Sequence, residues 1–260
     1  MTAGDVYEKI IVSKKYSSLY KPLIMRVCEE ECFKYKKDKD KIKAVKNKLH
    51  MIYGAFVTEE CHKKAEKIIK SADFDILKHS VEIMKFHTSS NERVSSINEF
   101  YRFIFGVIGE TDSIIDIGCG FNPFSIPYMP VKITRYYALD IDCRTTELLN
   151  FYFRILNLPR FASGADIVSG DQPLKAGTDA AFIFKMLPVL EAQAEGRGFG
   201  LIAELDVKYA VVTYPVMSLC GKKKGMEKNY AEIFEAGLYG GLKIIEKKVI
   251  GGELIYVIKK

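Results

Sequence analysis

A short apolar run that ends in an acid and a pair of glycines occupies residues 113–123 and reads Ser113-Ile114-Ile115-Asp116-Ile117-Gly118-Cys119-Gly120-Phe121-Asn122-Pro123. Buried parallel strands are rich in β-branched residues. Glycines after such a strand let the backbone approach a ligand that a Cβ atom would push away. The pattern predicts a central strand over 113–117 in an open α/β sheet, with a ligand bound beyond its carboxyl end.

A second apolar run, twenty residues past Gly120, also ends in acids and reads Tyr136-Tyr137-Ala138-Leu139-Asp140-Ile141-Asp142. In open α/β sheets that bind nucleotides, an acid at this spacing holds the ribose hydroxyls. We therefore expect a nucleoside cofactor, with Asp140 at its ribose.

The glycine turn distinguishes between two cofactor classes. A dinucleotide site favours G-x-G-x-x-G and a free helix N-terminus directly after it, whereas this chain has Pro123 at the last glycine position. Asp116 would repel a pyrophosphate but suits a cation, and S-adenosylmethionine carries both a sulfonium and an ammonium group. The motif favours S-adenosylmethionine over a dinucleotide or a glycine turn without a ligand.

Composition limits the remaining possibilities. The chain has 260 residues, 48% of them hydrophobic, which is enough for one large domain or a domain with an appendage. No run of eighteen apolar residues predicts a membrane span, and the first fifteen residues do not resemble a secretion signal. The six cysteines have neither metal-site nor disulfide spacing, so we expect free thiols, no metal and a cytoplasmic location.

The positive charge is concentrated near the N-terminus. Residues 1–80 contain 18 Lys and Arg against 12 Asp and Glu, whereas residues 81–260 contain 21 of each. A basic segment attached to a neutral domain favours a polyanionic partner such as nucleic acid, although a lysine-rich helix can also be simply a solvated surface.

Apolar periodicity divides the chain into two parts. Residues 1–80 show helical spacing throughout and predict an all-helical, basic module, whereas 81–260 predict the α/β domain. Strands are expected at 113–117, 135–140, 162–167, 179–184, 208–213, 242–249 and 253–258, the last two as a hairpin around Gly251-Gly252. Helices are expected at 143–156, 188–206 and 226–237.

Three further residues are candidates for cofactor contacts. Asp166 follows a strand and suits an adenine amino group, or serves as a turn acid or helix cap. Lys185 interrupts an apolar run at a strand end and faces the cleft or snorkels. Arg93 is expected near a helix start capped by a serine, a costly place for a cation, which indicates either a ligand carboxylate or an ordinary surface arginine.

The segment 213–230 is a candidate for substrate contact. Tyr214-Pro215 at a strand end matches the aromatic-proline element that many base methyltransferases use to stack a target base. A basic run, Lys222, Lys223 and Lys224, lies between two glycines and suits phosphate contact or a solvated loop.

Together these motifs resemble one known family. Five segments occur in order: Lys48-Leu49-His50-x-x-Tyr53-Gly54, His87-x-Ser89-x-Asn91-Glu92-Arg93, Asp116-x-Gly118-Cys119-Gly120-x-Asn122-Pro123, Lys185-x-Leu187-Pro188-x-Leu190 and Ser218-Leu219-x-Gly221-Lys222-x-Lys224-Gly225-Met226-Glu227-x-Asn229-Tyr230. They resemble the aminoglycoside-resistance 16S rRNA (guanine(1405)-N(7))-methyltransferases over nearly the whole chain. Tyr214 stands where many members have phenylalanine.

The resemblance implies a Rossmann-like class I S-adenosylmethionine-dependent methyltransferase sheet with an N-terminal all-helical module that grips 16S rRNA in the 30S subunit. It implies that Arg93 holds the methionine carboxylate, Gly118 the methionine backbone, Asp140 the ribose and Asp166 the adenine. The remaining cofactor contacts are expected from Asp116, Cys119, Gly120, Ile141, Ile167 and Lys185. Those to rRNA are expected from Lys14, Lys15, Lys46, Lys48, Lys222, Lys223 and Lys224.

The expected reaction is methyl transfer to guanine N7, an unprotonated lone pair that needs no general base. We therefore expect no acid or base, with Tyr214 as a candidate for stacking the base, and no obligate protein partner beyond the ribosome. The alternatives are a methyltransferase of another rRNA or tRNA base, and a catalytically silent rRNA-binding factor.

Overall fold

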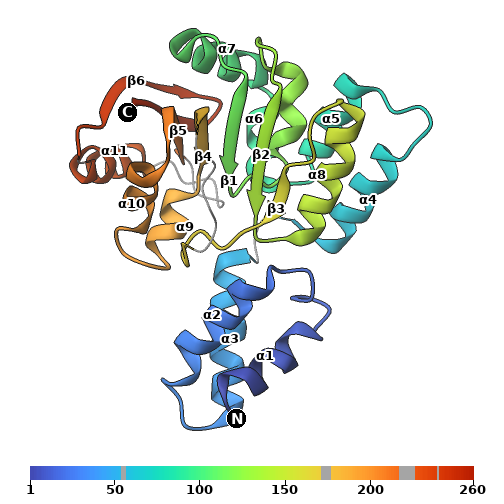
Figure 1. Ribbon diagram of the computed structural model, residues 1–260, viewed down its shortest axis with the longest axis vertical. Coiled ribbons are helices and arrows are strands. Elements are labelled where there is room, and N and C mark those ends of the chain that lie inside the picture. Colours follow the sequence, from blue (N-terminus) through green and yellow to red (C-terminus); the bar gives the residue numbers. More distant parts are fainter. Residues whose placement is uncertain (54–56, 171–176, 217–225, 239) are drawn as a thin grey trace.

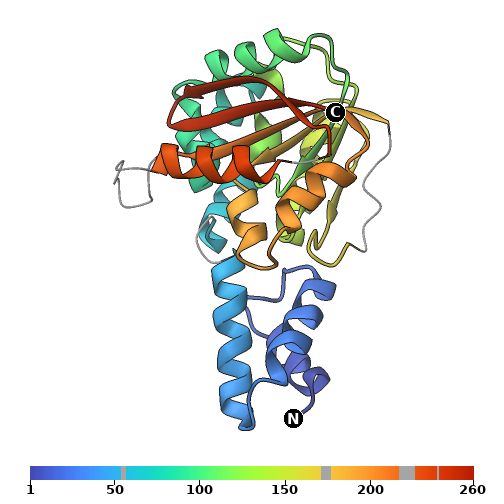
Figure 2. The ribbon, with the colours of Figure 1, turned by 90° about the vertical axis from the view of Figure 1, so that its left-hand side faces the viewer.

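The chain forms a helical module joined to a larger α/β body (Figure 1). The computed structural model describes residues 1–53, 57–170, 177–216, 226–238 and 240–260. The module consists of α1 (Ala3–Ile11), α2 (Lys21–Cys32) and α3 (Asp38–Tyr53). It projects from one end of the body, with the N-terminus at its far tip (Figures 1 and 2).

Local sequence explains the helices of the module. Thr2 caps α1 in a reciprocal capping box with Asp5, and Pro22 lies in the first turn of α2, where its missing N–H is harmless. The apolar stripes that predicted these helices meet in a separate core, in which Val6, Val27 and Leu49 are fully buried. The module thus has a hydrophobic core of its own.

The body is built on one seven-stranded sheet in the order β3-β2-β1-β4-β5-β7-β6. The strands are β1 (Ser113–Ile117), β2 (Arg135–Asp140), β3 (Ala162–Gly164), β4 (Thr178–Phe184), β5 (Val207–Pro215), β6 (Lys243–Ile250) and β7 (Glu253–Lys259). The first five run parallel, and β7 is antiparallel to both β5 and β6. The predicted sheet and its closing hairpin are confirmed.

Helices cover both faces of this sheet. One face carries α4 (Glu59–Ile69), α5 (Ile76–Met84), α6 (Thr88–Val94), α7 (Ile97–Ile108), the 3-10 helix η1 (Asn122–Tyr128) and α8 (Cys143–Ile155). The other carries α9 (Leu187–Glu191), α10 (Arg197–Glu204) and α11 (Met226–Gly237). Among the helices of the described ranges, none is long and apolar enough to cross a membrane.

Three sequence-based boundaries differ from the structure, the first being the strand expected at 162–167, which ends at Gly164. The division expected at residue 80 falls inside the α/β body, because Ala65 of α4 and Met84 of α5 pack into the sheet's core rather than into the core of the module. The single helix expected at 188–206 is two helices, because Gly196 has a left-handed backbone (φ +75°) that interrupts the helical hydrogen bonding.

The module is attached to the body by backbone pairing beside the end of β2. The N–H of Tyr20 donates to the Ile141 carbonyl (2.8 Å), and the N–H of Cys143 donates to the Ser18 carbonyl (2.9 Å). Tyr20 also lies directly over Gly164, where a Cβ atom would come within 2.6 Å of the tyrosine ring. The close approach of module and sheet therefore requires glycine at position 164.

Replacing Gly164 by alanine should force the module away from the sheet and lower the free energy of unfolding by about 1–3 kcal/mol, the usual cost of overpacking. Gly106→Ala is the matched control, because its added methyl in α7 would meet no atom within 4 Å apart from the neighbouring backbone of its own helix, and it should be neutral or stabilising. Chemical denaturation measures both changes. Equal stability of the two variants would show that this contact does not fix the module.

Candidate functional site

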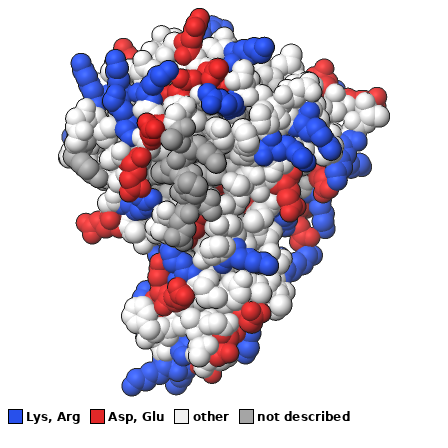
Figure 3. Space-filling model, viewed as in Figure 1, with Lys and Arg blue, Asp and Glu red and all other residues white. Residues whose placement is uncertain are grey.

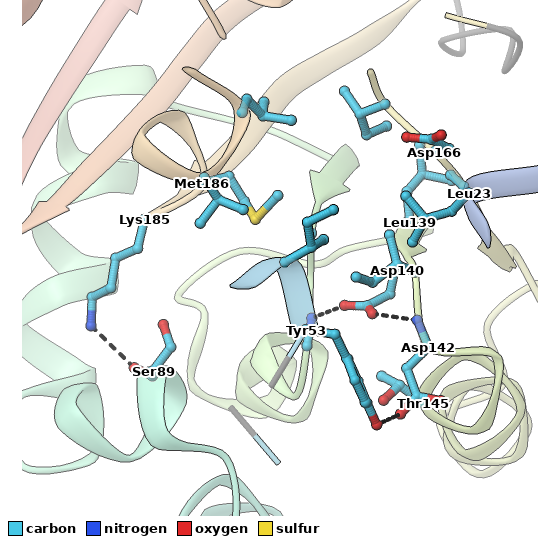
Figure 4. Close-up of a pocket in the computed structure, with 18 of the residues that line it drawn as sticks. Leu23, Tyr53, Ser89, Leu139, Asp140, Asp142, Thr145, Asp166, Lys185 and Met186 are labelled. Carbon is cyan, nitrogen blue, oxygen red and sulfur yellow. Dashed lines mark hydrogen bonds between the residues drawn. The ribbon is translucent and has the colours of Figure 1, made fainter. Parts of the chain in front are cut away.

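A cavity lies at the carboxyl edge of the sheet, beyond the ends of β1, β2 and β4 (Figure 4). The strand order changes direction between β1 and β4, which is where ligands bind in open α/β sheets. The predicted cofactor residues that line it are Gly118, Gly120, Asp140, Ile141, Asp166, Ile167 and Lys185.

Both glycines of the turn are required by their surroundings. Gly118 and Gly120 have left-handed backbones, with φ of +65° and +48°. A Cβ atom on Gly118 would lie 2.3 Å from the sulfur of Met186, and one on Gly120 would lie 2.5 Å from Nε2 of His87. The turn therefore needs glycine for both its conformation and its close packing.

Each carboxylate oxygen of Asp140 accepts one hydrogen bond from a backbone N–H. Its Oδ2 accepts from the N–H of Gly120 (2.8 Å) and its Oδ1 from the N–H of Asp142 (2.9 Å). Burial raises the pKa of Asp140 to about 6, although these hydrogen bonds favour the carboxylate. Each oxygen keeps a lone pair, so the side chain can accept two further hydrogen bonds side by side.

Asp166 lines the opposite end of the cavity from Lys185 (Figure 4). Its carboxylate is almost fully buried and accepts two bonds from Arg26 of α2, from Nε at 2.6 Å and from Nη2 at 3.1 Å. The N–H of Val168 donates to the same group (3.2 Å). The adjacent Ile167 adds apolar wall beside it.

Lys185 supplies the positive charge on the cavity wall. It follows β4 with a left-handed backbone (φ +59°), which non-glycine residues rarely adopt and which clusters at functional sites. Its Nζ donates to the Glu92 carboxylate and to the Ser89 carbonyl, and lies 3.3 Å from Glu253 of β7. The ammonium is therefore held at one end of the cavity by residues of α6 and β7.

Arg93 is buried behind the cavity wall and does not line it. It lies in the last turn of α6, where the helix dipole favours a cation, so the expectation of a costly position near a serine-capped helix start was wrong. Its guanidinium bonds Asn122 (2.6 Å) and pairs with Glu253 (2.9 Å). This arginine is already paired within the protein.

Asp116 and Cys119 are likewise buried and do not line the cavity. Asp116 faces the helical layer, where its carboxylate accepts from the Tyr136 hydroxyl (2.6 Å) and from the Asn122 amide (2.9 Å). Burial raises the pKa of Asp116 to about 6. In this structure the acid anchors the turn after β1 rather than facing a ligand.

Tyr214 is placed in the protein core, which does not support its role in base stacking. Its side chain faces the layer of α9–α11 and is 3% exposed. The ring stacks on Tyr230 at 4.8 Å between centroids and packs against Phe234. The aromatic-proline pattern identified the residue, but its ring is covered by neighbouring aromatic rings and does not line the cavity.

Several predicted rRNA-binding lysines gather on one part of the module. Lys14, Lys15 and Lys46 are exposed and Lys48 is half-buried. The α1–α2 turn and α3 meet there, since Lys15 contacts His50 (3.2 Å) and Tyr16 bonds the Lys46 carbonyl (3.2 Å). Figure 3 shows basic and acidic side chains interspersed on its face of the molecule. Lys222, Lys223 and Lys224 lie outside the described residues.

The structure adds cavity residues that the sequence analysis did not assign to the site. Leu23 and Ile52 come from the helical module, and Met186 and Gln193 follow β4 and α9. Tyr53 also lines the cavity and donates to Asp142 (2.7 Å). Of these five residues Tyr53 had a sequence signal, as part of the segment that begins at Lys48; His87, Ser89 and Leu190, which also line the cavity, stood in the other quoted segments.

Comparison with known proteins gives full-length matches. Residues 12–257 match the family described as "Ribosomal RNA methyltransferase (FmrO)". A 16S rRNA (guanine(1405)-N(7))-methyltransferase of Serratia marcescens is 34% identical, covering 100% of this chain and 99% of its own. One from Proteus mirabilis is 32% identical, covering 98% and 96%.

Solved structures agree with these sequence matches. The 16S rRNA methyltransferase RmtF, in complex with S-adenosyl-L-homocysteine, has a TM-score of 0.89 at 31% identity, covering 99% of this chain and 98% of its own. An rRNA methylase from Escherichia coli has a TM-score of 0.83 at 31% identity over the full length of both chains. The chain therefore belongs to the ribosomal RNA methyltransferase (FmrO) family.

Proposed function

We propose that this protein transfers a methyl group from S-adenosylmethionine to N7 of guanine 1405 of 16S rRNA in the small ribosomal subunit. The observation that carries this proposal is the length of the match: relatives with this activity in their names align with the helical module as well as with the cavity. The relatives therefore share with this chain both the helical module, which we assign to rRNA binding, and the cavity, which we assign to methyl transfer.

The cavity suits the cofactor along its whole length. Asp140 offers one free lone pair on each oxygen, which matches the two hydroxyls of a ribose. Asp166 is the acceptor for the adenine amino group, with Ile141 and Ile167 beside it. Gly118 and Lys185 lie at the other end, where the backbone and the ammonium suit the methionine portion.

The methionine carboxylate is assigned first to Lys185. The family resemblance gives this role to Arg93, but the guanidinium of Arg93 bonds Asn122 and Glu253 and does not line the cavity. Arg93 would reach the carboxylate only after releasing one of these partners. Lys185 is already on the wall, and Glu92, its more exposed partner, is the group a ligand carboxylate can displace.

Catalysis in this proposal rests on placement rather than on proton transfer. Bound S-adenosylmethionine supplies a methyl group on a sulfonium, and guanine N7 has a free lone pair on its major-groove edge. The protein must hold the two in line and exclude water. His87 at the cavity is neutral, since burial lowers its pKa to about 3, and no step requires its charged form.

The product explains a biological effect. Methylation at N7 places a positive charge and added bulk on a base of the decoding site. A polycationic aminoglycoside would be repelled there, so we propose that the enzyme confers aminoglycoside resistance. Methylation of another rRNA or tRNA base, and rRNA binding without catalysis, are the alternatives that the following experiment separates.

The modified nucleotide can be located directly. Small subunits incubated with the enzyme and S-adenosylmethionine should give chain scission at guanine 1405 after borohydride and aniline treatment, because borohydride reduces the N7-methylated base, which is then lost, and aniline cleaves the chain at that nucleotide. Primer extension reads the position. A stop elsewhere identifies a different target base, and the absence of any modification despite cofactor binding supports a silent binding factor.

Affinity for S-adenosylhomocysteine should fall as the pH is lowered through the pKa of Asp140. The carboxylate is the form that accepts both ribose hydroxyls, so protonation below about pH 6 removes an acceptor. Binding should be constant from about pH 8 to 7 and weaken about tenfold by about pH 5. Calorimetry measures this change.

The Asp140→Asn variant serves as the control for that experiment. It should bind more weakly at neutral pH, because a charge-assisted hydrogen bond contributes about 1.5–3 kcal/mol. It should also lose the pH dependence. An Asp140→Asn variant with the full slope would assign the titration to another group, such as Asp116, whose pKa is also about 6.

A triple alanine variant at Lys14, Lys15 and Lys46 should bind small subunits more weakly. The slope of log affinity against log salt concentration should become shallower by up to about 0.7–0.9 for each lost phosphate contact. The matched control replaces Lys132, Lys208 and Lys243, which are exposed at the opposite, amino edge of the sheet. Both triple variants should bind S-adenosylhomocysteine normally. Equal salt slopes for the two would remove this surface from the rRNA interface.

A further inference from the structure

The helical module forms part of the cofactor cavity. Leu23 of α2 and both Ile52 and Tyr53 of α3 line it together with the strand ends of the body. In Figure 4 Leu23 lies beside Asp166, and the ring of Tyr53 lies beside Asp140 with its hydroxyl directed at Asp142. A segment expected to serve rRNA binding alone is therefore part of the cavity wall.

One side chain of the module holds two residues of that wall from separate segments of the body. Arg26 of α2 holds the Asp166 carboxylate with Nε and Nη2, and Nη2 also donates to Oε1 of Gln193 (3.0 Å). Its Nη1 is held by Glu30 of the same helix (2.7 Å). Arg26 does not line the cavity, but both residues it holds do.

The arrangement of these atoms leaves the carboxylate one free acceptor position. Among the described residues, Oδ1 of Asp166 accepts from Arg26 and from the Val168 N–H, while Oδ2 accepts only from Arg26. An oxygen has two lone pairs, so Oδ2 retains one. Because the guanidinium is planar and binds both oxygens, it fixes the direction of that lone pair.

The position of Arg26 is itself fixed by the fit of module to body. The backbone bonds of Tyr20 to Ile141 and of Ser18 to Cys143 set the register just before α2 begins. The absence of a side chain at Gly164 lets Tyr20 lie against β3. Movement of the module would therefore displace Arg26 from Asp166.

We propose that Arg26 is a positioning residue for adenine recognition, acting through Asp166, and that docking of the helical module and binding of the cofactor are therefore coupled. This inference rests on the proposed cofactor site. Since coupling of binding equilibria is reciprocal, bound cofactor also stabilises the docked module. The surface of the module that carries Lys14, Lys15 and Lys46 is then presented in one orientation when the cofactor is in place.

The test compares two ligands that differ at the adenine amino group: S-adenosylhomocysteine and S-inosylhomocysteine, which has a carbonyl oxygen instead. Calorimetry on the full chain gives the ratio of their affinities for the native protein, Arg26→Ala and Arg26→Lys. Arg26→Ala should lower the affinity for S-adenosylhomocysteine roughly tenfold or more, which is the effect expected when an oriented charge-assisted hydrogen bond is lost. The same variant should leave the affinity for S-inosylhomocysteine nearly unchanged. Arg26→Lys should restore part of the native ratio between the two affinities.

Two controls separate positioning from general damage. Lys34→Ala removes a cation beyond the end of α2 that pairs with Glu31 and does not line the cavity, so both affinities should stay native. The double variant Arg26→Ala with Asp166→Asn should bind S-adenosylhomocysteine no more weakly than Asp166→Asn alone. Thermal unfolding confirms that each variant is folded.

Three results would overturn the inference. An equal loss for both ligands in Arg26→Ala would show general distortion of the cavity, and no loss would show that Asp166 needs no positioning. Additive effects in the double variant would show that Arg26 does not act through Asp166. All three leave the proposed function intact, because that function fails only if the native protein binds no S-adenosylhomocysteine or modifies no guanine.

Discussion

A buried arginine imposes the strongest constraint on this structure. Arg93 is 1% exposed, and an unpaired guanidinium at that depth would cost several kcal/mol. The protein neutralises it with Glu253 and places it between the rings of Phe100 and Phe184, each about 4.5 Å away. These partners come from α7, β4 and β7, so the position of one charge relates the helical layer to two separate strands of the sheet.

The same charge explains the residues that follow the glycine turn. Asn122 accepts from Arg93 through its amide oxygen and donates to Asp116 through its amide nitrogen. No other side chain of similar size offers both a donor and an acceptor in this way. The Asn-Pro pair therefore links the arginine to the acid of β1 and holds the turn in the form that the cavity needs.

The sequence predicted the sheet well because its signals are local. Each strand is an apolar run of its own. Gly118, Gly120 and Asp140 follow such runs directly, and this position was enough to predict that they lie at a ligand site. Contacts between distant segments were missed, because no local pattern pairs Arg26 with Asp166. The apolar stripes of α4 and α5 resemble those of α1–α3. A stripe shows that a helix is buried on one side but not which of two cores it packs into, so the domain boundary was placed too far along the chain. For Tyr214 the alternation with Val212 places both side chains on the face covered by α9–α11, but it could not show burial, because Leu139 and Leu190 on that face do line the cavity.

The joint between module and body has a consequence for how the chain acquires its structure. The module is held together by contacts within 53 residues, whereas the Arg26–Asp166 pair spans 140 positions and Tyr53–Asp142 spans 89. Local contacts form quickly and distant ones slowly, and the N-terminal part leaves the ribosome first. The three helices are thus expected to assemble during synthesis, long before β2 and β3 exist to receive them. Docking comes last, and the cavity is completed only at that step.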